Sequence, residues 1–540
     1  MTSARTPGSP DGYMTRPEGS SPADASLASP CRGLALDGGA RAELLLRCER
    51  AVRRARREAK PVTSGARQCG AVLAGLTVRV GPGVDPSAVV FASRGPDDDW
   101  FCFEQPDRDG AALAALGCVA RLDPAAGAQV RGARHGIFRG GDDRTAGERR
   151  RAARDQRFAE AAAAWRALAG SAVCDAPDGP AGAGLVAVGG FAFAPEGGAA
   201  PHWARFGAAG LTVPELALAR RGRDVRLTVA VLAAPDDLPE ELVARVEARL
   251  AGTRERPLPL LDPAPSGRFR IASTAPPEHY EAAVARAVER IRSGAFEKIV
   301  LAREVAVHAP APHDVAAVFG VLRAGFDSCF VYCAGRGDAA FVGASPELLV
   351  RREGLRASTV ALAGSTRRSA DPAVDAHLGE QLLHSEKDRE EQAIVSRRIA
   401  RALKPLSVWV AAPDEPGIVR VANIQHLATP IRAQLTQPRS ALELAGLLHP
   451  TPAVGAEPHA TAAPLIPAFE GLDRGWYAGP VGWTDANEDG EFCVALRCAL
   501  LRGAEARLYA GVGVVRDSEP AAELAETEVK LGALLPVLSG

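Results

Sequence analysis

The chain has 540 residues, of which 64 are Lys or Arg and 65 are Asp or Glu, so its formal net charge is −1. Proteins dedicated to nucleic acid usually carry a basic excess, because neutralised phosphates supply much of their affinity. No run of about 18 apolar residues occurs, so we expect no membrane span. The first 30 residues hold no signal-like apolar stretch and the ten cysteines form no CxxC pair. We therefore expect a cytoplasmic protein with reduced thiols.

The N-terminal region differs in composition from the rest of the chain. Residues 1–38 are rich in Ser, Pro, Gly and Ala and hold few large apolar groups, which predicts disorder. Residues 39–60 have a basic, helical pattern. We interpret them as a solvated helix or linker, with an interaction arm as the alternative. Residues 1–60 are thus predicted to be an N-terminal extension.

The rest of the chain is predicted to contain both strands and helices. Short apolar runs predict strands over 71–80, 86–93, 184–193 and 224–233, and periodicity predicts helices over 149–168 and 238–252. Residues 253–268 are Pro-rich and predict a long connection. The second half is predicted to hold helices over 278–293, 384–402 and 520–535 and strands over 296–307 and 492–501. Without strict β-α-β alternation, this order favours an α+β architecture with largely antiparallel sheets.

Lysine is rare in this chain, and only Lys60, Lys298, Lys387, Lys404 and Lys530 occur. A desolvated lysine can lose its proton near neutral pH, whereas arginine cannot. Lys298 begins the apolar strand predicted over 296–307, where desolvation would make it a possible base. The alternative is a lysine that snorkels at a strand edge.

A candidate acid lies further along the chain. Glu347 follows Ser-Pro and directly precedes an apolar run. A carboxyl group held there could have a raised pKa and donate a proton. The alternative is a carboxylate that only begins a strand or caps its end.

Two predicted helices each carry carboxylates on one face. Asp388 and Glu391 are three residues apart, and Glu523, Glu526 and Lys530 lie at positions i, i+3 and i+7. Carboxylates without a thiol or paired histidine suit a hard cation such as Mg²⁺. Ordinary solvated helix charge is the alternative.

The strand predicted over 492–501 carries an arginine among small residues. Period-2 alternation puts Arg497 on a face with Cys493, Ala495 and Ala499, which leaves room for a bidentate carboxylate ligand. The glycines of AGVGVV, which follow, would let a ligand approach the backbone closely.

Eight motifs occur in an order that resembles the chorismate-utilising enzymes, namely FEKIVLAR, GASPELL, LAGSTRR, SEKDREE, IQHLATP, HPTPAVG, LRCALL and YAGVGVVRDSEPAAELAETEVK. That family includes isochorismate, salicylate, anthranilate and aminodeoxychorismate synthases, and the isochorismate synthases are the most similar subgroup. The resemblance implies one domain over 61–540, with an N-terminal part over 61–265 and a motif-bearing catalytic part over 266–540. The implied fold is α+β, with two stacked antiparallel-rich sheets, outer helices and an active site in the cleft between the sheets.

The resemblance also implies roles for single residues. Lys298 resembles the base that activates water for attack at ring carbon 2 of chorismate, and Glu347 resembles the acid that protonates the departing hydroxyl at ring carbon 4. Glu391 and Glu526 resemble Mg²⁺ ligands, with Asp388 and Glu523 in or near that shell. The residues that resemble substrate-binding groups are Gly364, Ser365, His426, Tyr477, Arg497, Gly511, Gly513 and Lys530.

Two neighbouring features separate the members of this family. Ala363 stands where aminodeoxychorismate synthase carries a nucleophilic lysine, and Gly364–Ser365 is similar to the isochorismate synthases rather than to the Gly-Thr of anthranilate and salicylate synthases. We therefore predict an isochorismate synthase that serves menaquinone or siderophore biosynthesis. A salicylate synthase is the alternative, and an inactive chorismate-binding regulatory protein is the alternative of another class. The expected partners are chorismate and Mg²⁺, without nucleic acid or membrane, in a monomer or weak homo-oligomer.

Overall fold

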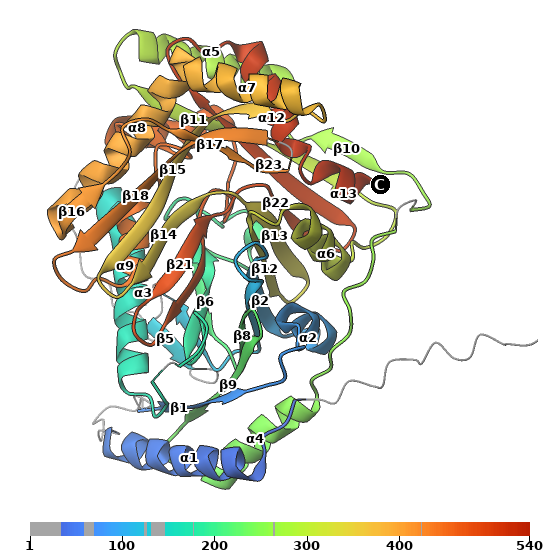
Figure 1. Ribbon diagram of the computed structural model, residues 1–540, viewed down its shortest axis with the longest axis vertical. Coiled ribbons are helices and arrows are strands. Elements are labelled where there is room, and N and C mark those ends of the chain that lie inside the picture. The colour runs from blue at the N-terminus through green and yellow to red at the C-terminus, as the bar shows by residue number, and fades with distance from the viewer. Residues whose placement is uncertain are drawn as a thin grey trace, which may run out of the picture.

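The computed structural model describes residues 34–58, 70–123, 127–130, 146–176, 178–262, 265–422 and 424–540. Two large β-sheets face each other, with helices on their outer sides (Figure 1). The named strands pair antiparallel throughout the described residues. The α+β architecture with two stacked antiparallel sheets is therefore confirmed.

The first sheet, sheet A, runs through both halves of the chain. Its strands, in spatial order, are β1 (Val72–Arg79), β9 (Asp224–Ala233), β8 (Leu216–Arg221), β3 (Ala111–Leu116), β2 (Asp99–Gln105), β12 (Phe330–Arg336), β13 (Ala339–Ser345), β22 (Cys498–Arg502), β23 (Glu505–Val514), β11 (Lys298–His308) and β10 (Arg270–Ser273). The short β19 (Ala456–Glu457) also pairs with β11.

The second sheet, sheet B, likewise takes strands from both halves of the chain. Its strands, in spatial order, are β16 (Ser407–Ala411), β18 (Ile424–Leu435), β15 (Arg356–Arg367), β14 (Leu348–Glu353), β21 (Gly490–Val494), β20 (Pro480–Asp485), β6 (Val186–Phe191), β7 (Ala209–Val213), β4 (Ala120–Asp123) and β5 (Gly127–Val130). A further strand, β17 (Gly417–Arg420), pairs with β18. The segments before and after the Pro-rich connection thus share both sheets and the core between them.

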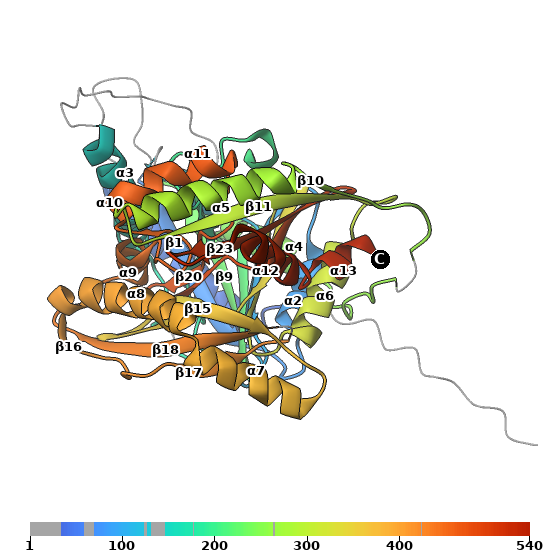
Figure 2. The same ribbon diagram turned by 90° about the horizontal axis from the view of Figure 1, so that it is seen from above.

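The helices cover the outer faces and ends of the sheets. They are α1 (Gly38–Glu58), α2 (Pro86–Ser93), α3 (Ala146–Gly170), α4 (Pro239–Ala251), α5 (Pro277–Arg292), α6 (Val315–Gly325), α7 (Pro372–His384), α8 (Glu386–Leu403), α9 (Ala441–Leu448), α10 (His459–Ala462), α11 (Ile466–Glu470), α12 (Pro520–Leu531) and α13 (Leu535–Ser539). Figure 2 shows α7 and α8 against β15 and β18, and α5 and α11 over β11. Among the described residues, no helix combines the length and apolarity needed to cross a membrane.

Most predicted elements are present, but one predicted strand is wrong. Residues 86–93 form helix α2, which begins after Asp85; the side chain of Asp85 accepts a hydrogen bond from the amide of Ala88, and Pro86 occupies the first turn. Asp followed by Pro is a helix-start signal. A short apolar run cannot by itself distinguish a buried helix from a strand, and here the cap decides.

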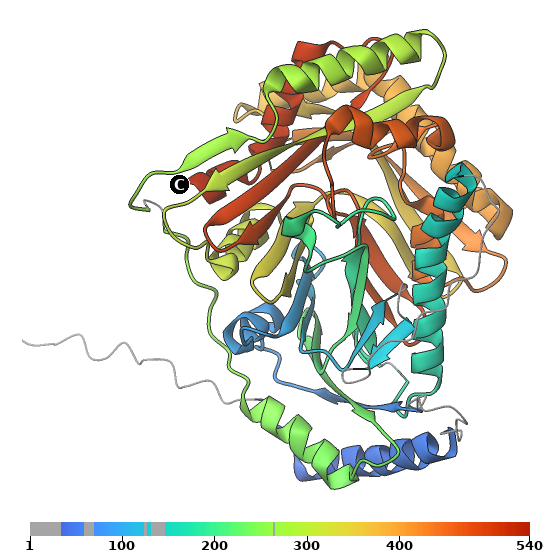
Figure 3. The ribbon, with the colours of Figure 1, turned by 180° about the vertical axis from the view of Figure 1, so that it is seen from behind.

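The basic N-terminal helix is present, but it is not a solvated linker. The side chains of Leu44, Cys48, Ala51 and Val52 are buried, and α1 packs on β1 and beside α4 (Figure 3). Its Arg47 donates to the carbonyl of Gly75 (2.7 Å). Most of its other arginines lie on the exposed side of the helix, and the buried side makes the interpretation as a solvated linker wrong. Disorder was predicted over residues 1–38, of which 1–33 lie outside the described residues. For 34–38 the prediction is wrong, since the amide of Leu34 donates to the hydroxyl of Thr253 (2.9 Å) and α1 begins at Gly38.

The strand predicted over 492–501 is divided between the two sheets. Cys493 lies in β21 of sheet B, whereas Cys498 is the first residue of β22 of sheet A. Arg497 lies in the crossing segment with a positive φ of 47°, so it does not share a strand face with Cys493 and Ala499 as predicted. Continuous alternation in the sequence hid this break, because both flanking segments are strands.

Candidate active site

Two crossings between the sheets position a carboxyl group and a guanidinium group. Glu347 lies between β13 of sheet A and β14 of sheet B, and Arg497 lies between β21 and β22. The crossings are bonded to each other, since the amide of Val494 donates to the carbonyl of Glu347 (3.0 Å) and the amide of Ala344 donates to the carbonyl of Arg497 (3.1 Å). Glu347 and Arg497 are thereby held next to the space between the sheets.

A cavity between the sheets gathers eleven of the fourteen predicted site residues. Those that line it are Glu347, Gly364, Ser365, Glu391, His426, Tyr477, Arg497, Gly511, Gly513, Glu526 and Lys530. The other three, Lys298, Asp388 and Glu523, lie behind this lining and contact its residues or neighbours. The sequence separations span more than two hundred residues, so the fold brings together side chains that no local pattern connects.

Lys298 is fully buried at the start of β11, and its Nζ lies 2.8 Å from Oε1 of Glu391 on α8. Gly513 of β23, directly opposite Val300, makes this contact possible. A Cβ at position 513 would lie 2.1 Å from Oε1 of Glu391 and 2.9 Å from Cε of Lys298. The glycine is therefore required by the close approach of the two side chains.

Gly513→Ala should lower kcat/KM at least about tenfold, because the added methyl group forces Glu391 and Lys298 apart and small displacements of catalytic groups are costly. Steady-state kinetics with chorismate, the substrate that the resemblance implies, would measure this. Gly417→Ala in β17 is the matched control, since a Cβ there meets nothing within 4 Å. Equal kinetics of the two variants would contradict the proposed packing.

Glu347 is buried, with 2% of its surface exposed. Burial raises the pKa of Glu347 to about 8, although the charge of Lys298 and a hydrogen bond with Thr451 act in the opposite direction. Desolvation disfavours the charged form of a carboxyl group, so Glu347 is mostly protonated at neutral pH. The cavity thus holds a carboxylic acid that can donate a proton.

Each of the four carboxylates predicted to hold a metal has an ammonium or hydroxyl partner. Lys530 lies 2.8 Å from Glu526, which also accepts from Ser365 (2.8 Å), and Lys387 lies 2.7 Å from Glu523. Although burial acts against it, Lys530 holds the pKa of Glu526 below its usual value. Asp388 pairs with the hydroxyl of Ser385. Three of the five lysines therefore lie at these carboxylates.

The carboxylate set fits a hard cation in its chemistry. It offers only oxygen donors, and both Glu391 and Glu526 line the cavity. Within the described ranges, no three carboxylate, imidazole or thiol groups are already arranged as a metal-ligand set. A cation would therefore have to replace the ammonium groups of Lys298 and Lys530 as the partner of these two glutamates.

His426 fixes the orientation of Arg497. Its Nδ1 lies 3.3 Å from the carbonyl of Gly364 and its Nε2 lies 3.1 Å from Nη2 of Arg497. Burial and the charge of Arg497 lower the pKa of His426 to about 3, so the ring is neutral. A carbonyl only accepts and a guanidinium only donates. The proton therefore sits on Nδ1, and Nε2 accepts from Arg497.

Arg497 has no anionic partner within the described ranges. No carboxylate among the described residues forms an ion pair with it, and its Nε has no hydrogen-bond partner. Burial lowers the pKa of Arg497, but guanidinium groups stay charged in proteins. A buried cation of this kind is suited to a carboxylate of a ligand.

Backbone amides of β23 lie beside this guanidinium. Gly511 accepts a hydrogen bond from Nζ of Lys530 (2.9 Å), whereas Ala302, its partner on β11, donates to Glu470 (2.7 Å). The backbone N–H and C=O groups of Gly511 and Ala302 thus point away from each other, as in a non-hydrogen-bonded antiparallel pair. The amides of Gly511 and Gly513 therefore point to the open side of β23. A Cβ at Gly511 would lie 2.7 Å from the hydroxyl of Tyr477.

The sequence did not assign three residues that the structure places at the site. Lys387 pairs with Glu523, Thr451 hydrogen-bonds Glu347, and Tyr509 lines the cavity and stacks on Tyr477 with ring centroids 5.3 Å apart. The rarity of lysine was a signal for Lys387, and Thr451 belongs to the HPTPAVG motif. Tyr509 begins the YAGVGVV motif, but the motif alone did not indicate a role for its ring, which depends on the pairing of β23 with β11.

Comparisons with known proteins agree with this arrangement. The family model described as "Chorismate binding enzyme" matches residues 144–539. The salicylate biosynthesis isochorismate synthase of Pseudomonas aeruginosa is 40% identical over 387 residues, which cover 71% of this chain and 80% of that protein. The isochorismate synthase MenF of Bacillus subtilis is 34% identical over 357 residues, or 66% of this chain and 75% of that protein. The chain belongs to the chorismate binding enzyme family.

Solved structures confirm the fold that the resemblance implied. MenF, the menaquinone-specific isochorismate synthase from Escherichia coli, superposes with a TM-score of 0.68 at 24% identity, over 92% of this chain and 99% of that chain. Anthranilate synthase component I from Streptococcus pneumoniae superposes with a TM-score of 0.57 at 19% identity, over 78% of this chain and 91% of that chain. The two-sheet architecture is thus common to enzymes with different names.

Proposed function

We propose that this protein is an isochorismate synthase, which converts chorismate to isochorismate. The observation that carries the proposal is the buried Glu347, whose pKa burial raises to about 8, in a cavity that also exposes Glu391, the partner of the buried Lys298. An acid that lines the cavity and an amine directly behind the lining are the two groups that the reaction requires. The similarity to enzymes named isochorismate synthases supports the same activity.

The reaction exchanges one hydroxyl group for another across the ring diene. Lys298, in its neutral form, accepts a proton from water as the water oxygen bonds to ring carbon 2. The double bonds shift, and the bond between ring carbon 4 and its hydroxyl breaks. Glu347 donates its proton to this hydroxyl, which leaves as water. One water is consumed and one released, so the substrate is isomerised, and proton transfers of this type contribute about 10²–10⁴ each to the rate.

The substrate carries two carboxylates, and the cavity offers a separate partner for each. Arg497, oriented by His426, and the amides of Gly511 and Gly513 would bind the pyruvyl carboxylate. Glu391 and Glu526, with Asp388 and Glu523 close by, would hold Mg²⁺. When bound, Mg²⁺ would neutralise the ring carboxylate of the substrate. A cation at Glu391 would also take over that carboxylate's pairing with Lys298, and a base must be neutral to accept a proton.

Glu526→Gln should raise the Mg²⁺ concentration that gives half-maximal activity by about tenfold to a hundredfold, because one charged oxygen ligand is lost. Titration of activity with Mg²⁺ would measure this. The matched control is Glu528→Gln on the same helix, whose carboxylate pairs with Arg303 and is 59% exposed. An unchanged Mg²⁺ requirement in Glu526→Gln would argue against a metal at this carboxylate.

Incubation of the purified protein with chorismate and Mg²⁺, followed by chromatography, tests the proposed function directly. We expect isochorismate as the single product. Salicylate together with pyruvate would instead indicate a salicylate synthase, which eliminates pyruvate after the same first reaction. The absence of turnover would favour a protein that only binds chorismate. A role in menaquinone or siderophore biosynthesis and a cytoplasmic location stay predictions of the sequence.

A further inference from the structure

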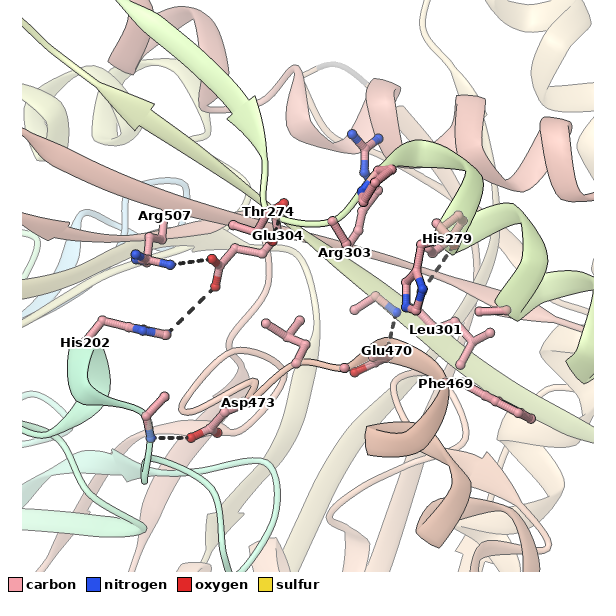
Figure 4. A pocket seen from close by; sticks show the side chains of 18 residues that line it. His202, Thr274, His279, Leu301, Arg303, Glu304, Phe469, Glu470, Asp473 and Arg507 are labelled. Carbon is pink, nitrogen blue, oxygen red and sulfur yellow. Dashed lines mark hydrogen bonds and ion pairs between the residues drawn. The ribbon is translucent and has the colours of Figure 1, made fainter.

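A second pocket, of about 290 Å³, lies beside β11, away from the catalytic cavity (Figure 4). It is bounded by α5, by the end of α11 and the loop after it, and by residues of β11 and β23. Along this edge of β11, β19 pairs with residues 298–299 and β10 pairs with residues 305–308. The pocket occupies the gap between these two short strands.

Side chains, rather than another strand, satisfy the backbone in this gap. Oε1 of Glu470 accepts from the amide of Ala302 (2.7 Å), and Nη2 of Arg474 donates to the carbonyl of Val300 (2.9 Å). Glu470 and Arg474 are also an ion pair with each other. Two backbone groups of this edge are therefore already engaged by side chains, which disfavours an added peptide strand. The pocket is suited to a small molecule instead.

One buried oxygen faces this pocket without a hydrogen bond. Glu304 is 3% exposed, and its Oε1 accepts from Nη1 of Arg507 (2.6 Å). Its Oε2 has no hydrogen-bond partner and lies 3.8 Å from Nε2 of His202, which also has none (Figure 4). A buried carboxylate oxygen without a hydrogen-bond donor lowers the stability of the folded protein. The hydroxyl of Tyr509 also interacts with this carboxyl group, and Oε2 of Glu304 can still accept a hydrogen bond from a donor in the pocket.

The surrounding charges favour a cationic donor. Both guanidinium groups of the lining already have carboxylate partners: Arg303 pairs with Glu528, and Arg507 pairs with Glu304 and Glu505. An anion would therefore find no unengaged arginine among the described lining residues, while the lining carboxylates would repel it. Burial lowers the pKa of His202, so this ring supplies no fixed positive charge.

Beside these polar groups, the pocket has an apolar wall formed by Leu301, Phe469 and Tyr280. We propose that the pocket binds a small organic ammonium compound, with its ammonium group at Oε2 of Glu304 and its apolar body against Leu301 and Phe469. An ammonium group satisfies the buried carboxylate oxygen, and an aromatic or aliphatic body fills the apolar part.

Glu304 also connects the second pocket to the catalytic cavity. It lies directly opposite Tyr509 in the register of β11 and β23, and Tyr509 lines the catalytic cavity and stacks on Tyr477. A ligand that binds Glu304 would change the electrostatic environment of the Tyr509 hydroxyl. This coupling rests on the proposed function, and it predicts that occupancy of the second pocket changes KM for chorismate.

Binding of 2-phenylethylamine to the full-length protein, measured without chorismate by isothermal titration calorimetry and ligand-observed NMR, tests the site. A ligand of this size is expected to bind with a dissociation constant in the millimolar range. The uncharged analogue 2-phenylethanol should bind at least about tenfold more weakly, because it lacks the ion pair with Glu304. Equal binding of the two compounds, or no binding of the amine up to about 10 mM, would overturn the proposal.

Two variants assign the signal to this pocket. His279, an exposed residue of α5, lines its mouth, so His279→Trp should block the amine, whereas Glu278→Trp, at the exposed neighbouring position outside the lining, should not. Glu304→Gln should weaken binding at least about tenfold by removing the charge. Wild-type affinity in both His279→Trp and Glu304→Gln would overturn the assignment.

The coupling is tested separately with chorismate and Mg²⁺. We expect 2-phenylethylamine to change KM for chorismate at least about twofold in the wild type and in Glu278→Trp, but not in His279→Trp. An unchanged KM at saturating amine would overturn the coupling and leave the site intact. Failure of the proposed function would be recognised differently, as the absence of turnover without any amine.

Discussion

Glu347→Gln is expected to lower kcat for isochorismate formation by about 10²–10⁴-fold, because the amide keeps the shape of the carboxyl group but has no proton to donate. The leaving group is a hydroxyl, which departs poorly unless it is protonated as the bond breaks. Stopped assays of isochorismate, separated by chromatography, would measure the loss. A matched control is Asp485→Asn, which changes another buried carboxyl group outside the catalytic cavity, with a pKa raised by burial to about 7. It should retain kcat.

The pH profile gives a second measurement of the same group. Since the pKa of Glu347 is about 8, the donor is present below this pH and is lost above it. We expect kcat of the wild type to fall about tenfold per pH unit above 8. The raised pKa also means that the folded protein binds a proton that the unfolded chain releases between pH 4.5 and 8, so stability falls as pH rises through that window. Glu347→Gln should lack this decline, and an active, pH-independent variant would refute the acid assignment.

Lys298→Gln is expected to reduce kcat by about 10²–10⁴-fold, since the amide cannot accept a proton from water. The amide can still donate a hydrogen bond to Glu391, which lies 2.8 Å from Nζ in the wild type. The variant should therefore fold normally. Rapid-mixing kinetics and thermal unfolding in the absence of chorismate would measure both properties.

Lys298→Ala separates catalysis from stability at this position. It should lose activity to the same extent, and it should also unfold more readily, by about 3–5 kcal/mol, because Glu391 would keep a largely buried charge without its partner. Near-wild-type rates in either variant would refute the role of Lys298 as the base. Equal stability of the Ala and Gln variants would show that the pair with Glu391 contributes little to folding.

Sequence reasoning located the site through residues whose chemistry is unusual for their surroundings. Lys298 at the start of an apolar strand and the two carboxylate-bearing helices were visible as patterns, and the resemblance of eight ordered motifs joined them. The pairings of those carboxylates were not visible. That Lys387 lies against Glu523, and Lys298 against Glu391, depends on how α8 packs beside β11 and α12.

Each error arose because a local sequence pattern is compatible with more than one structure. Helix α2 was predicted to be a strand because an apolar run of eight residues satisfies both interpretations until its cap is considered. The crossing at Arg497 was hidden because period-2 alternation persists when a chain leaves one sheet and enters another. The N-terminal helix looked solvated because its charged face dominates its composition, although small residues such as Ala51 and Ala55 form a buried face.

The mutual hydrogen bonds of the two crossings have a mechanical consequence. Because the segments of Glu347 and Arg497 are tied to each other and each spans both sheets, a relative displacement of the sheets moves the proton donor and the carboxylate anchor as a unit. A substrate held by Arg497 would thus keep its alignment with Glu347 while the opposite wall, formed by α8 and α12, adjusts. Admission and release of the substrate are then expected to occur on the side of these two helices.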